Sequence, residues 1–406
     1  MPLASNAKET FNYDEGKVPE YSLPPVLQSN AGHEITKAVE WTRIRRPEVL
    51  ALFEEHMYGK TPEKKWAIRH KELRRNDNAL GGNIIQREIR VFFTDRDERP
   101  YMDILVHQPK TDGAVPVFVG LNFHGNHATT ADPDVTLSDA WMRSSSKNHN
   151  VNHRATEKSR GTAASRWPAE LITSRGYAVA TIYCGDLDPD MHDGYKNGIH
   201  PLFERSERGN EWTTIGAWAW GLSRALDVFE GDSTLDASRV AVIGHSRLGK
   251  TSLWAGAQDE RFGLVISNNS GCGGAALSRR AFGETVKRIN TSFPHWFCDN
   301  FKKYNGKEGD CPVDQHMLIS LMAPRPVYVA SAEGDRWADP RGEFLSCVGA
   351  DPVYKLLGTD GLPSHEFPAV NTPIHGRIGY HLRTGKHDIN EYDWAQYLDF
   401  ADKEWR

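Results

Sequence analysis

Cysteine, long apolar runs and clustered basic residues are scarce in this sequence, and each scarcity excludes a class of protein. The five cysteines are scattered without C-x-x-C spacing, so neither a zinc site nor a redox pair is indicated. Their odd number leaves at least one unpaired within the chain, while one or two disulfides and the compartment stay open. No run is long and apolar enough to cross a membrane, and residues 1–6 lack the charged and apolar regions of a signal peptide.

The overall composition is that of an ordinary globular protein. A formal net charge of −5, with 39% hydrophobic and 25% charged residues over 406 positions, predicts a sizeable core. Because no basic run or domain-wide positive excess is present, nucleic acid is not expected as a partner. Most of the 12 tryptophans are expected in the core, although one or two in a cleft would suit stacking on sugar rings.

The stretch 240–257 organises the rest of the chain. Four apolar or small residues lead into Gly-His-Ser-Arg-Leu-Gly, and a helical pattern begins at Lys250, so Ser246 stands at the apex of a strand–turn–helix unit. The letters match the phosphate-binding pattern G-x-x-x-x-G-K-[ST] completely. They also approach the nucleophile elbow G-x-S-x-G, except that Leu248 stands where that motif has glycine. The motif alone favours nucleotide binding, so the rest of the chain must decide.

The residues downstream favour a hydrolase. A strand at 327–331 runs into a loop that carries Asp335, and His387 lies in a polar turn before a terminal helix, which gives the order Ser, Asp, His of an α/β-hydrolase. A nucleotide-binding domain needs a magnesium-binding Asp after its next strand, but 264–266 is followed by Ser-Asn-Asn. A helix-capping role for Ser246 and an ordinary loop position for His387 are the competing interpretations.

The remaining pattern predicts a mainly parallel sheet. Residues 1–32 are expected as a surface arm, and 33–406 as one α/β domain with a loop insertion at 128–162. Alternating strands and helices from 116 to 331 predict parallel strands with helices on both faces, hence an α/β-hydrolase fold. Helices are expected at 47–58, 167–174 and 212–229, and strands at 66–73, 84–94, 101–108, 116–122 and 177–183, the first three of them antiparallel.

Three loop features have both a functional and a plain structural interpretation. Gly125, after the strand at 116–122, stands where such enzymes supply an oxyanion-hole amide, and a simple turn glycine is an equal alternative. His149 and His153 are four apart in the insertion, yet without a third ligand a solvated loop is favoured over a metal site. The acidic loop 184–190 lacks the closing Glu of a calcium loop, so a solvated turn is expected there.

From Gly244 onward the sequence resembles the glucuronoyl esterases, carbohydrate esterase family 15. The motifs that carry the resemblance are Gly244-His-Ser-Arg-Leu-Gly-Lys250, Ser270-Gly-Cys-Gly-Gly274 with Ser278-Arg-Arg280, Asn290-Thr-Ser-Phe-Pro-His-Trp296, Asp314-Gln-His316 and Trp337-Ala-Asp-Pro340. The resemblance implies hydrolysis of the ester that joins a glucuronic acid side group of xylan, with or without its 4-O-methyl group, to an alcohol of lignin.

The resemblance also implies roles for individual residues. Ser246 would attack the uronoyl carbonyl, and His387 would take its proton and return it to the leaving alcohol. The backbone amide of Arg247 suits the oxyanion hole, where its side chain would add positive charge. No metal or cofactor is implied. The residues expected to contact the sugar, with surface charge or core packing as their alternatives, are Lys250, Glu284 and Trp337.

One position departs from the family pattern. Many members carry a glutamate just before the Ser-Gly-x-Gly-Gly segment as the triad acid, whereas this chain has Asn269. Because an amide cannot stabilise an imidazolium as a carboxylate does, the acid must come from elsewhere, and Asp335 is the choice. Asp339 and Glu333 are the fallbacks, and Asp388 is expected only to shape its own turn.

Two other functions stay open at this point. One is a carbohydrate esterase that removes acetyl or feruloyl groups, and the other is a nonenzymatic binding protein on a hydrolase scaffold. The expected partner is a glucuronoxylan or lignin–carbohydrate ester, with neither nucleic acid nor a membrane. The protein is expected to be a monomer and, by the family resemblance, secreted or periplasmic.

Overall fold

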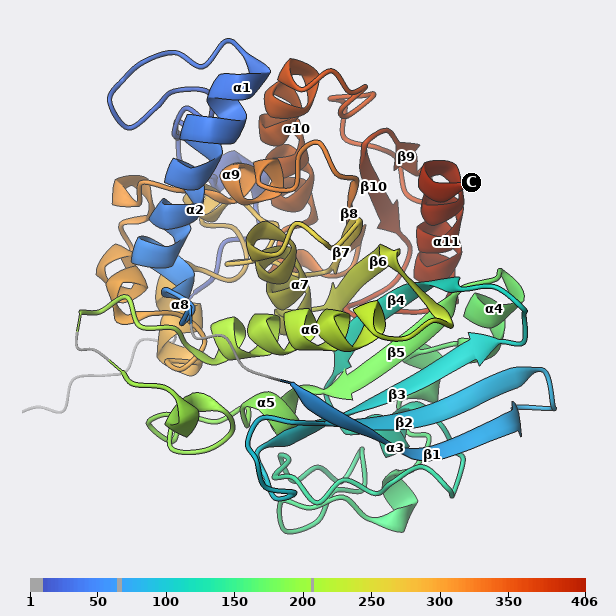
Figure 1. The fold of residues 1–406 in the computed structure, drawn as a ribbon. Coiled ribbons are helices and arrows are strands. Elements are labelled where there is room, and N and C mark those ends of the chain that lie inside the picture. The colour runs from blue at the N-terminus through green and yellow to red at the C-terminus, as the bar shows by residue number, and fades with distance from the viewer. Residues whose placement is uncertain (1–9, 64–67, 206–207) are drawn as a thin grey trace, which may run out of the picture.

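A ten-stranded sheet forms the centre of the computed structural model, which describes residues 10–63, 68–205 and 208–406 (Figure 1). The strands lie in the order β1-β2-β3-β5-β4-β6-β7-β8-β10-β9. The six strands from β5 to β10 in that order run parallel, whereas β1, β2, β3 and β9 pair antiparallel with their neighbours. The strands are β1 (Arg69–Ala79), β2 (Ile84–Phe92), β3 (Tyr101–Pro109), β4 (Val115–Asn122), β5 (Ala178–Tyr183), β6 (Leu235–His245), β7 (Leu264–Asn268), β8 (Val327–Ala332), β9 (Ile374–His375) and β10 (Ile378–Arg383).

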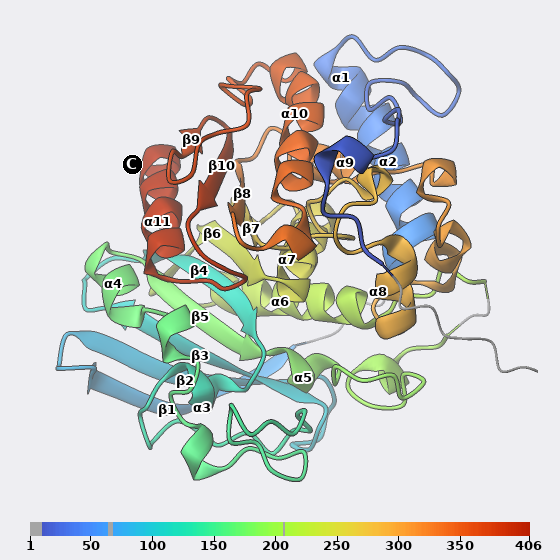
Figure 2. The same ribbon diagram turned by 180° about the vertical axis from the view of Figure 1, so that it is seen from behind.

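Helices cover both faces of the sheet, which buries the central strands on two sides (Figures 1 and 2). On one face α6, α7, α9 and α10 contribute to the larger apolar core. On the other face α4 and α11 enclose a second core around Phe118 and Trp394. The helices are α1 (Ala38–Glu40), α2 (Arg46–Phe53), α3 (Asn126–Thr129), α4 (Ala169–Ser174), α5 (Cys184–Leu187), α6 (Thr214–Glu230), α7 (Arg247–Gln258), α8 (Val286–Ser292), α9 (Gln315–Ser320), α10 (Pro340–Leu356) and α11 (Glu391–Trp405).

The first helix and the first strand both differ from the sequence prediction. The helix expected to begin at Pro47 already begins at Ala38, because a π-turn, in which the N–H of Arg46 donates to the carbonyl of Trp41, carries the chain past the proline. Of the strand predicted at 66–73, residues 66 and 67 lie outside the described residues. The observed β1 continues to residue 79, and its exposed polar side chains leave no apolar alternation in the sequence.

The insertion at 128–162 packs on the antiparallel end of the sheet. Its residue Thr136 donates from its backbone N and its Oγ1 to the buried carboxylate of Glu88 on β2, at 2.9 and 3.0 Å. His149 and His153 are exposed, and the ring of His153 stacks on Trp141 with 5.2 Å between ring centroids. In the ranges that the structure describes, no three His, Cys, Asp or Glu side chains are grouped to hold a metal ion.

Two questions that the composition leaves open can be answered from the fold. All five cysteines are free thiols and all are buried, so the chain contains no disulfide. Among the described helices, none is both long enough and apolar enough to span a membrane.

Candidate active site

Ser246 occupies a strained turn between β6 and α7. Its backbone lies at φ 58° and ψ −128°, a conformation that L-residues rarely adopt outside functional sites. A Cβ at position 244 would lie 1.9 Å from the carbonyl oxygen of Leu248, so the turn requires Gly244. A Cβ at position 249 would lie 3.0 Å from the Cβ of Ser270 and 3.1 Å from the carbonyl oxygen of Gly244, tight contacts that favour glycine there. The turn is therefore a nucleophile elbow in geometry, although its letters differ.

His387 and Asp335 meet beside this elbow. His387 follows β10 and Asp335 follows β8, and because the two strands are parallel neighbours their carboxyl ends meet at one edge of the sheet. His387 Nδ1 lies 2.6 Å from Asp335 Oδ2, with the imidazole 42% exposed and the carboxylate 4% exposed. The ring of His387 lies 4.6 Å, centroid to centroid, from the ring of His245, the residue before Ser246. Since the carboxylate accepts from Nδ1–H, Nε2 is left unprotonated to serve as a base.

The other carboxylates weighed from the sequence have different partners. Asp339 Oδ2 lies 2.8 Å from Arg280 Nε, and Asp339 also caps α10 by accepting from the amide of Gly342. Asp388 pairs with Arg166 at 2.8 Å, and the side chain of Glu333 is exposed. Asp335 is thus the one of these four carboxylates that is hydrogen-bonded to His387.

Asn269, which stands where many family members have a glutamate, binds backbone groups instead of His387. Its Nδ2 donates to the carbonyl of Asp388 at 3.0 Å and to Asn268 Oδ1 at 2.9 Å. Its Oδ1 accepts from the amide of Ala332 at 2.9 Å. The amide side chain therefore links the ends of β7 and β8 to the loop that carries His387.

His245 lies under His387 without adding a positive charge. Its Nδ1 lies 2.6 Å from Asn268 Oδ1, and burial, together with the charge of His387, lowers the pKa of His245 well below its ordinary value. A neutral His245 therefore does not oppose the protonation of His387 during catalysis.

The side chain of Arg247 is held next to the turn at Ser246 by two contacts. Its Nε lies 3.0 Å from Asp190 Oδ2, and its guanidinium carbon lies 4.5 Å from the ring centre of Phe123. Asp190 also accepts from Trp296 Nε1 at 2.8 Å. Burial by itself would raise the pKa of Asp190, but Arg247 and the hydrogen bonds from His295 and Trp296 hold that pKa below its ordinary range. The Arg247 side chain is thus anchored rather than free in solvent.

The acidic loop 184–190 is not the solvated turn that the sequence predicts. Asp186 and Asp188 are buried. Asp186 Oδ1 accepts from Arg99 at 3.0 Å, and Asp188 Oδ2 accepts from Thr214 Oγ1 at 2.6 Å. Each carboxylate has a donor that is distant in sequence, which offsets the cost of its burial and could not be read from the loop itself.

The structure distinguishes the two candidate oxyanion-hole donors, the backbone amides of Gly125 and Arg247. The amide of Gly125 already donates to Asn122 Oδ1 at 2.8 Å, so Gly125 is a turn glycine and the functional alternative is wrong for its amide. Arg247 is the first residue of α7, where backbone N–H groups have no intrahelical acceptor. The amide of Arg247 therefore remains the candidate donor at the elbow.

Lys250, Glu284 and Trp337 form a connected group. Lys250 is buried, and its ammonium donates to the carbonyls of Ser270 and Cys272, the latter at 2.6 Å. It is therefore not a helix-surface residue, and backbone carbonyls occupy two of its three N–H donors. Burial lowers the pKa of Lys250 while the nearby carboxylate of Glu284 opposes that shift, and the side chain of Trp337 hydrogen-bonds to Glu284.

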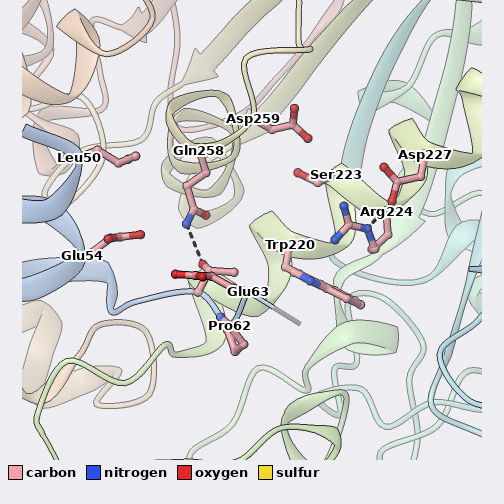
Figure 3. Close-up of a pocket in the computed structure, with 11 residues that line it drawn as sticks. Leu50, Glu54, Pro62, Glu63, Trp220, Ser223, Arg224, Asp227, Gln258 and Asp259 are labelled. Carbon is pink, nitrogen blue, oxygen red and sulfur yellow. Dashed lines mark hydrogen bonds and ion pairs between the residues drawn. The ribbon is translucent and has the colours of Figure 1, made fainter. Parts of the chain in front are cut away.

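A hollow at the C-terminal end of α7 lies away from these residues. It has a volume of about 470 Å³ and lies between α2, α6 and the C-terminal end of α7 (Figure 3). In its wall, Gln258 Nε2 donates to Thr61 Oγ1 at 2.7 Å. Since α7 is roughly 18 Å long and Ser246 precedes its first residue, this hollow is not part of the site.

Glu343 is a buried carboxylate that sequence reasoning missed. Its Oε1 accepts from the amides of Ser270 and Gly271 at 2.8 and 2.9 Å, and its Oε2 accepts from Ser331 Oγ at 2.6 Å. Burial raises the pKa of Glu343 to about 7. Glu343 lies in α10 and differs from an ordinary helix glutamate only in being buried. The sequence alone does not show that burial.

The fold and the site together define an α/β-hydrolase of the serine type: a mainly parallel sheet with helices on both faces, a strained serine between strand and helix, and a histidine paired with an acid after later strands.

Comparisons with known proteins identify the family. A family model described as "Glucuronyl esterase, fungi" matches residues 170–358. A carbohydrate esterase from an unknown prokaryotic organism is 51% identical over 397 residues, which cover 97% of this chain and 91% of that protein. The 4-O-methyl-glucuronoyl methylesterase of Phanerochaete carnosa is 30% identical over 209 residues, 49% of this chain and 51% of the relative.

Solved structures agree with these sequence matches. A promiscuous CE15 esterase from a marine bacterial metagenome superimposes with a TM-score of 0.93 at 51% identity, over 97% of this chain and 100% of that one. A glucuronoyl esterase from Solibacter usitatus has a TM-score of 0.91 at 46% identity, over 96% of this chain and 100% of that one. The chain belongs to carbohydrate esterase family 15, the glucuronoyl esterases, and this confirms both the family and the fold expected from the sequence.

Proposed function

We propose that the protein is a serine esterase that cleaves the ester between glucuronic acid, or its 4-O-methyl derivative, and an alcohol. The observation that carries this proposal is the Asp335–His387 pair beside the strained Ser246. Lys250, in the helix that follows Ser246, interacts with Glu284. The names of the relatives and of the structural neighbours support the same substrate class. Xylan and lignin lie outside cells, which supports a secreted or periplasmic location.

The three residues of the triad have different roles in this proposal. Ser246 Oγ loses its proton to His387 Nε2 and bonds to the uronoyl carbon, giving a tetrahedral intermediate. Asp335 holds Nδ1–H and stabilises the imidazolium that forms. His387 then gives its proton to the leaving alcohol, which leaves a glucuronoyl ester on Ser246. Water, deprotonated by His387, attacks that ester, and His387 returns the proton to Ser246 Oγ as the acid is released.

The charge that develops on the carbonyl oxygen lies beside the start of α7. The backbone N–H of Arg247 would donate to that oxygen, and the positive end of the α7 dipole points the same way. The guanidinium of Arg247, held by Asp190, adds a fixed positive charge nearby. Because negative charge develops on this oxygen only as the bond to Ser246 forms, these groups stabilise the transition state more than the ground state, and they need no rearrangement to do so.

The sugar itself would be recognised by Lys250, Glu284 and Trp337. Glu284 is half-buried and lies between the other two, so its carboxylate is oriented before a sugar hydroxyl binds. The half-buried indole of Trp337 would offer an apolar face to the ring of the sugar, and Phe11 packs edge-on against it, at 4.8 Å between ring centroids.

The substrate class is tested with matched esters. We expect the methyl or benzyl ester of glucuronic acid to be hydrolysed with a much higher kcat/KM than an aryl acetate or methyl ferulate. The methyl ester of galacturonic acid, which differs at one hydroxyl, measures how far the sugar contacts discriminate. Activity confined to acetate or ferulate esters would refute the uronate assignment, and no activity on any ester would favour a binding protein.

A broader ester range is a second candidate, because the neighbour at 51% identity is titled a promiscuous CE15 esterase. The same assay separates the two cases. Promiscuity gives comparable kcat/KM values for uronate and aryl acetate esters, all abolished together by Ser246→Ala.

A further inference from the structure

Arg383 binds the backbone on both sides of His387. It is the last residue of β10 and is 2% exposed. Its NH2 donates to the carbonyl of Lys386 at 3.1 Å and to the carbonyl of Asp388 at 2.6 Å, and its NH1 donates to the carbonyl of Thr384 at 3.0 Å. The loop that carries His387 is therefore wrapped around one guanidinium group.

The guanidinium is itself fixed from behind. Its Nε donates to both carboxylate oxygens of Asp393, at 2.9 and 2.8 Å, and Asp393 is fully buried in the first turn of α11. His381 Nε2 lies 2.9 Å from Asp393 Oδ1, and the amide of Asn390 donates to Asp393 Oδ2 at 2.8 Å. Because this buried carboxylate holds Nε, the NH1 and NH2 groups are directed at the carbonyls of the loop.

A second side chain, that of Asn269 just after β7, donates to the same loop. Asn269 Nδ2 donates to the carbonyl of Asp388 at 3.0 Å, so this oxygen accepts from both Asn269 and Arg383. Both donors act on the backbone of the loop, whereas Asp335 acts on the imidazole of His387. The imidazole is 42% exposed and contacts the ring of His245, so we expect its place to depend on these backbone contacts as well.

We propose that Arg383 is a positioning residue for the reaction: anchored by Asp393, it gathers the carbonyls on either side of His387 and so sets the imidazole between Asp335 and Ser246. This inference rests on the proposed role of His387 as the base. Arg383 does not touch the substrate. A lysine at this position cannot replace it, because an ammonium is a single point of charge and lacks the planar fork that reaches several carbonyls at once.

The test compares Arg383→Lys and Arg383→Ala with wild type on a glucuronate methyl ester. Displacing a reacting group by about 1 Å can cost on the order of a hundredfold in rate, so we expect kcat to fall about 10- to 100-fold in both variants. KM is expected to stay within about twofold, because the sugar contacts are unchanged. Added guanidinium chloride, below the concentrations that unfold the protein, is expected to restore part of the kcat of Arg383→Ala and none of that of Arg383→Lys.

Arg325→Lys is the matched control. Arg325 also donates to several backbone carbonyls, among them those of Gly256 at 2.7 Å and Phe262 at 2.9 Å, but it precedes β8, at the end of the sheet opposite Asp335. We expect this variant to lose thermal stability with kcat within about twofold of wild type.

The outcomes separate the two levels of the proposal. An unchanged kcat in Arg383→Lys overturns the positioning role, as does a fall in kcat no larger than that of Arg325→Lys. A fall in the kcat of Arg383→Ala that guanidinium does not relieve also overturns it. If Arg383→Ala does not fold, the division between kcat and KM in Arg383→Lys decides. Should His387→Ala keep its activity, the proposed function fails first, whatever the Arg383 variants do.

Discussion

Replacing Asp335 by asparagine tests the unusual source of the triad acid. In the structure, Asp335 Oδ2 lies 2.6 Å from His387 Nδ1, and Asp335 is 5% exposed. Asparagine keeps the shape but can donate from its Nδ2, which favours the tautomer of His387 that carries its proton on Nε2 and cannot accept from Ser246. The negative charge that stabilises the imidazolium is lost as well. In the serine protease triad that change lowers kcat on the order of 10⁴-fold, and we expect a loss of that order here with little change in KM.

Asp339→Asn is the matched control for this measurement. Asp339 is also buried and sits four residues away, but it pairs with Arg280 and caps α10. Breaking a buried ion pair by removing one partner costs about 3–5 kcal/mol, so we expect a clearly lower melting temperature with kcat within about twofold. The assay is the initial rate on benzyl glucuronate ester over a range of concentrations, with melting curves for each variant. A near-normal kcat in Asp335→Asn, or a comparable loss in Asp339→Asn, would refute the assignment.

Three further substitutions probe the surroundings of the site. Burial raises the pKa of Glu343 from 4.5 to about 7, so the folded state keeps a proton that the unfolded chain has lost, and stability falls as the pH rises through that window. The loss amounts to at most about 3 kcal/mol, and denaturant unfolding should show this slope in wild type and not in Glu343→Gln. Phe11→Ala, which removes the ring packed on Trp337, is expected to raise KM several-fold with kcat nearly unchanged; an equal fall in kcat would contradict this. Asn269→Glu turns a donor that faces the carbonyl of Asp388 into a carboxylate, so we expect a stability loss of about 1–3 kcal/mol and lower kcat; gain of activity in the double variant with Asp335→Asn would contradict this.

The proposed catalytic residues could be predicted from the sequence: Ser246 and Asp335 each follow an apolar run predicted as a strand, and His387 lies in a polar turn before a terminal helix. Ser246, Asp335 and His387 stand in polar loops after β6, β8 and β10, where parallel strands bring them to one edge. The glycine at position 249, one residue later than in the usual motif, is a true difference in sequence, and in the structure it lies close to Ser270 and Gly244.

The buried carboxylates around the site could not be predicted from the sequence, because their hydrogen-bond partners are far away in the chain. Glu343 binds amides 73 and 72 residues earlier, and nothing in the pattern of α10 marks it as a loop-holding residue. The burial of Asp186 and Asp188 was missed for the same reason: a run of carboxylates looks solvated until Arg99 and Thr214 are brought to it by the fold. The local sequence predicts strands and loops, whereas the stabilisation of a buried charge depends on contacts between residues far apart in the chain.

Mass spectrometry of the enzyme during turnover of a glucuronate methyl ester examines the nucleophile itself. The expected result is a covalent adduct with the mass of one glucuronoyl group, mapped to the peptide that contains Ser246 and absent from Ser246→Ala, which should also lose hydrolysis. Hydrolysis by Ser246→Ala at the wild-type rate, or an adduct on another residue, would contradict the proposed mechanism.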